Sequence, residues 1–121
     1  MTLGALGDID PDVESYCQEH YPDTPFYKDY KEMIQSGDCD AVITTFPHYL
    51  HPEMAIYAID HKMPVIVEKP AGVYNKQVRE MNDYAAAHPD VPFAIMFNQR
   101  TNSLYKQLKD IMDSGELGEM R

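Results

Sequence analysis

At 121 residues the chain is long enough for one domain and too short for two. Apolar residues make up 44% of it, enough for a packed core, which excludes wholesale disorder. The net charge of −10, with no basic cluster along the sequence, argues against nucleic acid and anionic membrane surfaces as partners.

Other features of the sequence predict where the protein resides. No apolar run approaches the roughly 20 residues that a membrane-spanning helix needs, and the stretch after Met1 has the pattern of neither a signal peptide nor a transit peptide. The two cysteines, Cys17 and Cys39, lack both CxxC and metal-finger spacing, which favours reduced thiols over a disulfide. We therefore expect a cytoplasmic protein.

Short apolar runs alternate with helical patterns along the whole chain. Asp10 is expected to cap a helix with Pro11 at its first position, and Asn75 to cap another. Gly115 is expected to stop the last helix. This alternation predicts right-handed βαβ units and a parallel sheet, the α/β class. The predicted strands are residues 2–7, 26–27, 41–46, 65–67 and 93–97, and the helical patterns lie within residues 11–20, 30–35, 51–59, 75–88 and 104–112.

One stretch, from Val65 to Pro70, predicts a strand that ends at candidate functional residues. Three β-branched residues indicate a strand buried on both faces, and Pro70 cannot extend a central strand. Glu68 and Lys69 therefore lie at the carboxyl end of this strand, where open α/β sheets bind their ligands. Lys69 is either a proton donor or acceptor there, or a surface lysine paired with Glu68.

The five histidines fall into two groups by their positions in the sequence. His48 and His51 form an HxxH at a strand end, but a metal site needs two or three further ligands and none lies nearby in the sequence, so no metal is predicted. The remaining histidines lie on helices or loops without evident partners, and we assign no role to His20, His61 and His88.

Four short motifs, in this order and spacing, resemble the Gfo/Idh/MocA family of NAD(P)-dependent oxidoreductases. The family's EKP signature is matched at residues 68–70, and its DAV…TP…H pattern resembles Asp40-Ala41-Val42 followed by Phe46-Pro47 and His51. Its N-x-R element resembles residues 98–100, and its closing SG-LGE resembles residues 114–119. The resemblance implies a Rossmann-like, doubly wound, mostly parallel sheet with helices on both faces. It also implies hydride transfer between nicotinamide and a small sugar or polyol substrate.

The resemblance implies site residues as well. Lys69 is the expected catalytic residue. Asp8 ends the first strand, where a dinucleotide fold places an acid on the adenosine ribose; the alternative is a second helix-capping aspartate beside Asp10. An acid followed by Ile9 favours NAD over NADP, since it would repel a 2′-phosphate. The expected cofactor-binding residues are Asp8, Phe46, Pro47, His48, His51, Glu68, Lys69, Pro70, Asn98 and Arg100.

The sequence departs from the family in what it lacks. It has no first strand with a G-x-G-x-x-G loop and no second, substrate-binding domain, so we expect residues 1–121 to be a partial NAD(P)-binding Rossmann domain. The strands ending at Asp8 and at Phe46 would flank the absent central strand. They should therefore either pair directly or keep open edges that invite self-association. Two alternatives to an enzyme stay open: a non-catalytic interaction or regulatory module, and an inactive gene remnant.

Overall fold

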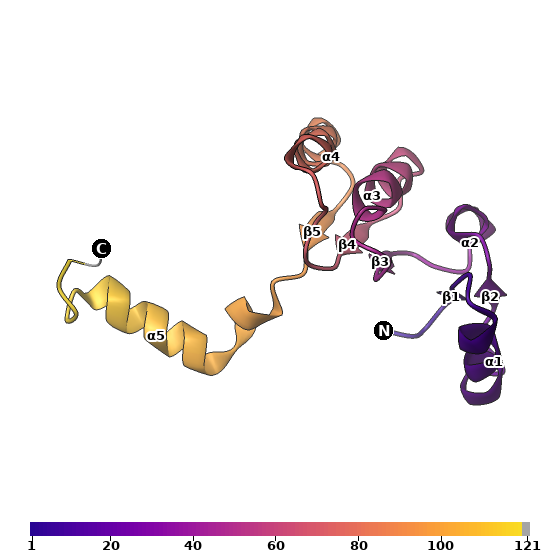
Figure 1. Cartoon of the computed structure of the whole chain (residues 1–121), viewed down its shortest axis with the longest axis horizontal. Coiled ribbons are helices and arrows are strands. Elements are labelled where there is room, and N and C mark those ends of the chain that lie inside the picture. The colour runs from indigo at the N-terminus through magenta and orange to yellow at the C-terminus, as the bar shows by residue number, and fades with distance from the viewer. Residues whose placement is uncertain (120–121) are drawn as a thin grey trace.

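The computed structural model describes residues 1–119, so the last two residues of the expected 1–121 domain lie outside it. Strands and helices alternate throughout, which confirms the α/β class (Figure 1). The elements are β1 (Leu6–Gly7), α1 (Pro11–His20), β2 (Phe26–Tyr27), α2 (Tyr30–Ser36), β3 (Val42–Thr44), α3 (His51–Asp60), β4 (Val65–Val67), α4 (Asn75–Ala87), β5 (Phe93–Ile95), the 3₁₀-helix η1 (Asn98–Thr101) and α5 (Ser103–Ser114).

Several strands are shorter than the apolar runs that predicted them. The run 2–7 pairs only over β1, the run 41–46 only over β3, and the run 93–97 only over β5. The length of a ladder is set by the partner strand, and β4, which lies between β3 and β5, is itself three residues long. The residues beyond the ladder enter loops and η1, which the sequence pattern did not indicate.

The strands form two parallel sheets rather than one. β1 pairs with β2, and a second sheet has the order β3-β4-β5. Within the described residues β1 and β3 have no strand between them and do not pair with each other, so each keeps an open edge. Direct pairing and open edges were the two arrangements expected for these strands, and the structure shows open edges.

Side chains from α2 and α3 join the two sheets. The Tyr30 ring packs edge-on against Tyr57, with ring centroids 5.6 Å apart, and lies 6.2 Å from the ring of Phe46. The Tyr30 hydroxyl donates to Glu53 Oε1 at 3.4 Å. Ile34 of α2 belongs to the same hydrophobic core as the residues of α3 and β4. The halves of the molecule are therefore held together by packing instead of by a backbone ladder.

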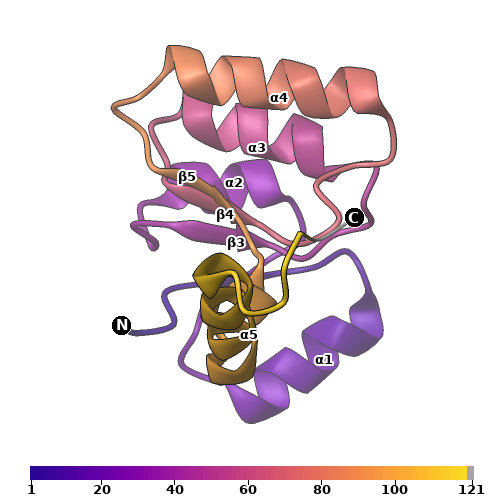
Figure 2. The same cartoon turned by 90° about the vertical axis from the view of Figure 1, so that its left-hand side faces the viewer.

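The main core lies between the three-stranded sheet and the two helices α3 and α4. Val65 and Val67 point into it from β4 and Ile59 and Met81 from the helices, with exposures of 2% or less. The face of β3 that points away from this core is not covered, since the Ile43 side chain is 52% exposed. Figure 2 shows α2, α3 and α4 on one side of strands β3–β5, with α1 and α5 on the other side of the sheet layer.

The helix ends follow the predicted capping chemistry with one exception. The Asp10 carboxylate accepts the Asp12 backbone N–H, and Pro11 opens α1. Gly115 ends α5 in the left-handed conformation at φ 78°. Asn75 does not cap α4: Tyr74 occupies the extended N-cap position, so Asn75 is already helical and its amide makes no capping bond.

Three histidines for which we expected no partner share one arrangement at helix C-termini. His20, His61 and His88 each place Nδ1 at 2.8–2.9 Å from the carbonyl oxygen of a tyrosine four residues earlier. Each imidazole also stacks on that tyrosine's ring, with centroids 4.0–4.3 Å apart. The expectation was wrong because the partners are local: Tyr-x₃-His at a helix end pairs the imidazole with a carbonyl of the last helical turn and packs two rings.

Helix α5 is amphipathic but buries nothing within the described chain. Its predicted apolar face is present, yet Leu104, Leu108, Ile111 and Met112 are 40–71% exposed. Figure 1 shows why, since α5 stands apart from the rest of the molecule. No helix among residues 1–119 is both long and apolar enough to cross a membrane.

Replacing Ile59 by alanine should lower the free energy of unfolding by about 2–5 kcal/mol, because it opens a cavity at a fully buried position. The matched change Ile111→Ala, also in a helix but 41% exposed, should cost about 0.5 kcal/mol or less. Urea unfolding followed by circular dichroism measures both. Equal losses in the two variants would contradict this placement of the core.

Alkaline pH should weaken the contact between α2 and α3. Burial, and then the nearby Glu53, raise the pKa of Tyr30 from 10.0 to about 12. The neutral phenol therefore adds stability that is complete below pH 10.0 and is lost as the pH rises towards 12. Urea unfolding at a series of pH values from 8 upward should show a shallower decline for Tyr30→Phe than for the unmodified chain. Identical declines would show that Tyr30 does not carry the effect.

Candidate functional site

The predicted site residues of the larger sheet meet at one edge because its strands are parallel and in register. Thr44 lies opposite Val67, which lies opposite Ile95, so the three strands end level. The ladder runs one step further, with the Glu68 N–H donating to the Thr44 carbonyl at 3.0 Å and the Met96 N–H to the Val67 carbonyl at 2.8 Å. The segments that follow carry the predicted residues 46–48, 68–70 and 98–100.

Glu68 and Lys69 are paired through the backbone and not through their charges. The Glu68 carboxylate accepts the Lys69 backbone N–H at 3.0 Å, which shapes the turn that follows β4. The Lys69 side chain is exposed, and no carboxylate among residues 1–119 lies within ion-pairing distance of its ammonium group. The peptide bond between Lys69 and Pro70 is cis. The turn thus presents a free ammonium group at the carboxyl edge of the sheet.

The two histidines of the HxxH have opposite surroundings. His48 is exposed, whereas His51 is only 1% exposed. The His51 Nδ1 lies 2.9 Å from the Pro70 carbonyl oxygen, and its Nε2 is buried without a hydrogen-bond partner among the described residues. The two rings are 5.8 Å apart. His48 is therefore available to a ligand at the surface, and His51 holds the turn from below.

The loop between β3 and α3 contains two further predicted residues. Phe46 is half-buried, with its ring near Tyr30. Pro47 is exposed, and its carbonyl accepts the Leu50 N–H at 2.9 Å, which closes the turn that leads into α3. That turn places His48 at the outer side of the edge.

Asp8 lies on the other sheet, at the end of β1. Its Oδ1 accepts the Asp10 N–H at 3.0 Å in a turn that leads into α1, while Asp10 itself caps the helix. Asp8 is half-buried and keeps a second carboxylate oxygen without a partner in that turn. The structure does not bring Asp8 into contact with Lys69, because the two residues end strands of separate sheets.

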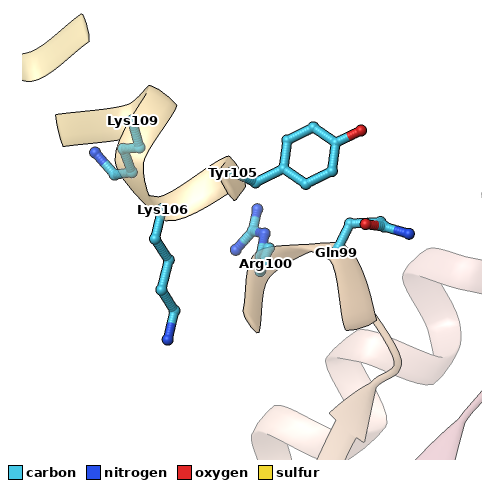
Figure 3. A pocket seen from close by; sticks show the side chains of 5 residues that line it. All are labelled: Gln99, Arg100, Tyr105, Lys106 and Lys109. Carbon is cyan, nitrogen blue, oxygen red and sulfur yellow. The ribbon is translucent and has the colours of Figure 1, made fainter. Parts of the chain in front are cut away.

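Asn98 and Arg100 lie on η1 and border hollows that the sequence did not predict. Arg100 stacks on the ring of Phe97, with its guanidinium carbon 5.3 Å from the centroid. It lines both an open hollow of about 400 Å³ along β5 and one of about 540 Å³ beside α5. Figure 3 shows the second, which lies between η1 and the start of α5. Its lining residues are Gln99, Arg100, Tyr105, Lys106 and Lys109.

These additional cations could have been found from spacing. Lys106 and Lys109 are three residues apart on one helix, so they lie on the same side of it. Together with Arg100 they form a basic cluster that linear inspection of the sequence missed. An anionic group is the ligand that such a hollow favours.

Neither metal chemistry nor thiol chemistry finds support at the site. Among residues 1–119 no group of three or more His, Cys, Asp or Glu side chains is placed to hold a metal ion. Both cysteines are free thiols, and burial, followed by the charges of Asp38 and Asp40, raises the pKa of Cys39. A thiol held protonated in this way is a poor nucleophile.

Comparison with known proteins agrees with this geometry. The family model of Gfo/Idh/MocA proteins, described as an oxidoreductase family with an NAD-binding Rossmann fold, matches residues 4–96. Inositol 2-dehydrogenase of Burkholderia multivorans is 31% identical over 115 residues, which cover 94% of this chain and 34% of that protein.

Solved structures give the same picture. The crystal structure of myo-inositol 2-dehydrogenase from Lactobacillus plantarum is 30% identical and superimposes with a TM-score of 0.87 over 96% of this chain and 34% of its own. Scyllo-inositol dehydrogenase from Lactobacillus casei, solved with NAD(H) and scyllo-inositol, shares the fold at 22% identity, with a TM-score of 0.87 over 95% of this chain and 34% of its own. The chain thus spans about a third of the length of these relatives. It belongs to the Gfo/Idh/MocA oxidoreductase family and has that family's NAD-binding Rossmann fold.

Proposed function

We propose that this chain forms part of the nucleotide-binding domain of an oxidoreductase that transfers hydride between NAD and a sugar or polyol. The observation that carries the proposal is the free Lys69 ammonium group, displayed on the turn that ends the central strand of a parallel sheet. The family supports NAD as the cofactor. The inositol dehydrogenases among its relatives support a polyol substrate, and a cytoplasmic location fits these small-molecule reactants.

The exposed polar groups fit the two ends of a dinucleotide. Asp8 keeps one carboxylate oxygen for the adenosine ribose, and its charge would repel a 2′-phosphate, which favours NAD over NADP. His48 and the turn at residues 68–70 would border the nicotinamide ribose, with Pro47 and Phe46 shaping the loop beneath and Asn98 and Arg100 on the far side. When bound, the cofactor supplies the hydride acceptor or donor.

Lys69 is the proposed proton donor and acceptor. Its ammonium group is not engaged by any carboxylate of the described chain, so it is free to hydrogen-bond the reacting hydroxyl or carbonyl oxygen of the substrate. A proton passed between Lys Nζ and that oxygen balances the charge as the hydride moves. The Glu68 carboxylate orients the lysine by holding its backbone N–H.

The parts of the relatives that this chain does not match would supply the rest of such an enzyme. The relatives are about three times as long, and the chain has no G-x-G-x-x-G loop to hold a pyrophosphate at a helix N-terminus. On this proposal residues 1–121 alone bind NAD weakly and turn over no substrate. Retention of the exposed Lys69 turn favours the enzyme over the alternative of a non-catalytic module or an inactive remnant, neither of which needs it.

A domain graft tests the role of Lys69. The matched residues of this chain would replace the corresponding segment of the Burkholderia multivorans inositol 2-dehydrogenase, which supplies the remaining two-thirds of the polypeptide. The graft should oxidise inositol with NAD, and Lys69→Met should lower kcat about 10²–10⁴-fold with NADH affinity nearly unchanged. Stopped-flow absorbance of NADH and fluorescence titration measure the two quantities.

Lys62→Met is the matched control, since Lys62 is an exposed lysine just after α3, at the edge of the sheet opposite to Lys69, where it pairs with Asp90. It should leave both quantities unchanged. Full turnover in Lys69→Met would remove this residue from the reaction. A well-folded graft that fails to bind NADH would contradict the nucleotide-binding proposal itself.

We further infer that the isolated chain self-associates through the open edge of β3. Ile43 is 52% exposed on an edge strand that has a neighbour on one side only. Sedimentation velocity at increasing protein concentration should show oligomers, and Ile43→Lys should shift the distribution towards monomer, because a charge on an edge strand opposes pairing. Ile9→Lys, at a residue that is 81% exposed outside the sheets, is the control. A monodisperse monomer for the unmodified chain at high concentration would refute the inference.

A further inference from the structure

The first turn of α3 and the turn after β4 are held together by two independent contacts. His51 is 1% exposed, and its Nδ1 lies 2.9 Å from the Pro70 carbonyl oxygen. Two residues after Pro70, a Cβ placed on Gly72 would come within 3.0 Å of Pro52, the residue after His51, and within 2.8 Å of Val78. The loop that follows Lys69 is therefore clamped between α3 and α4, with no room for a side chain at Gly72.

The polarity of the first contact is determined by its chemistry. A backbone carbonyl only accepts hydrogen bonds, so the His51 Nδ1 must carry the proton. The Nε2 is then a buried acceptor with no partner in the described chain. One ring nitrogen of His51 is therefore bonded to the turn, and the other is buried. Neither nitrogen is exposed at the surface where a cofactor would lie.

We propose that His51 is a positioning residue, which fixes the Lys69 turn through the Pro70 carbonyl and does not touch the cofactor. The two histidines of the HxxH thereby have different roles: His48 is exposed and remains available to a ligand, and His51 anchors the backbone that carries Lys69. The consequence for catalysis rests on the proposed function, but the anchoring itself does not.

Nuclear magnetic resonance of the 121-residue chain tests the anchor directly. The imidazole ¹H–¹⁵N spectrum should show His51 protonated at Nδ1, with a scalar coupling across the hydrogen bond to the Pro70 carbonyl carbon. His51→Leu removes the donor and should lower the ¹⁵N order parameters of Lys69, Ala71 and Gly72. His51→Asn places an amide N–H near the Nδ1 position and should restore them.

The outcomes separate the anchor from general stability. Loss of the whole fold in His51→Leu would still leave the tautomer and the coupling of the unmodified chain to be measured. Protonation at Nε2, or an ordered turn in His51→Leu, would overturn the proposal. Low order parameters in His51→Asn, in an otherwise folded chain, would do the same.

A kinetic readout in the graft described above separates positioning from cofactor contact. Displacing Lys69 should lower kcat about 10- to 100-fold in His51→Leu, with the KM for NAD nearly unchanged and most of the loss recovered in His51→Asn. A rise in the KM for NAD with kcat intact would instead place His51 on the cofactor. The loss of kcat rests on the proposed role of Lys69, whereas the tautomer, the coupling and the order parameters do not, so failure of the proposed function is distinguishable from failure of the anchor.

Discussion

The packing of α2 against α3 is the contact on which the rest of the structure depends. Among residues 1–119 no backbone ladder joins the two sheets, so the connection is made by Tyr30 and Ile34 of α2 packing against Tyr57 and the core residues of α3. Side-chain packing is less rigid than a ladder of hydrogen bonds. It follows that each sheet fixes its own part of the site firmly. The distance between Asp8 on one sheet and Lys69 on the other depends on how tightly Tyr30 and Tyr57 pack.

The two ends of the βαβ units have different physical roles. Each helix runs back against its strands, so the helix C-termini lie at the edge of the sheet opposite to Lys69. At that edge polar groups are satisfied locally, by the tyrosine–histidine pairs of α1, α3 and α4 and by the Lys62–Asp90 ion pair. At the carboxyl edge no carboxylate of residues 1–119 pairs with Lys69. Groups engaged with each other stabilise the fold, and groups left free are available to a ligand.

Local chemistry explains which features the sequence predicted. The buried strand before Glu68, the Asp10 cap and the Gly115 stop depend on neighbouring residues, and all three are present. The sequence could not show that β1 and β3 would keep open edges, because pairing depends on what lies between them in space. It also could not separate His48 from His51, since the burial of an imidazole depends on the distant Pro70. The tyrosine–histidine pairs were predictable in principle from their spacing of four residues, which places both rings on one side of a helix.

The net charge of the chain does not predict the charge around a single hollow on its surface. The chain has 10 basic and 20 acidic residues, and that balance alone disfavours any anionic ligand. Yet Arg100, Lys106 and Lys109 line a single hollow beside η1. Lys109 is paired with Asp113, which leaves Arg100 and Lys106 to act on a ligand. Since exposed charges beyond about 10 Å are largely screened at physiological salt, the field in the hollow depends on these cations and on the nearby Asp110 and Asp113 of α5, and not on the overall balance. The net charge therefore disfavours a long polyanion, which would meet the acidic surface around the hollow, more strongly than a small anionic group.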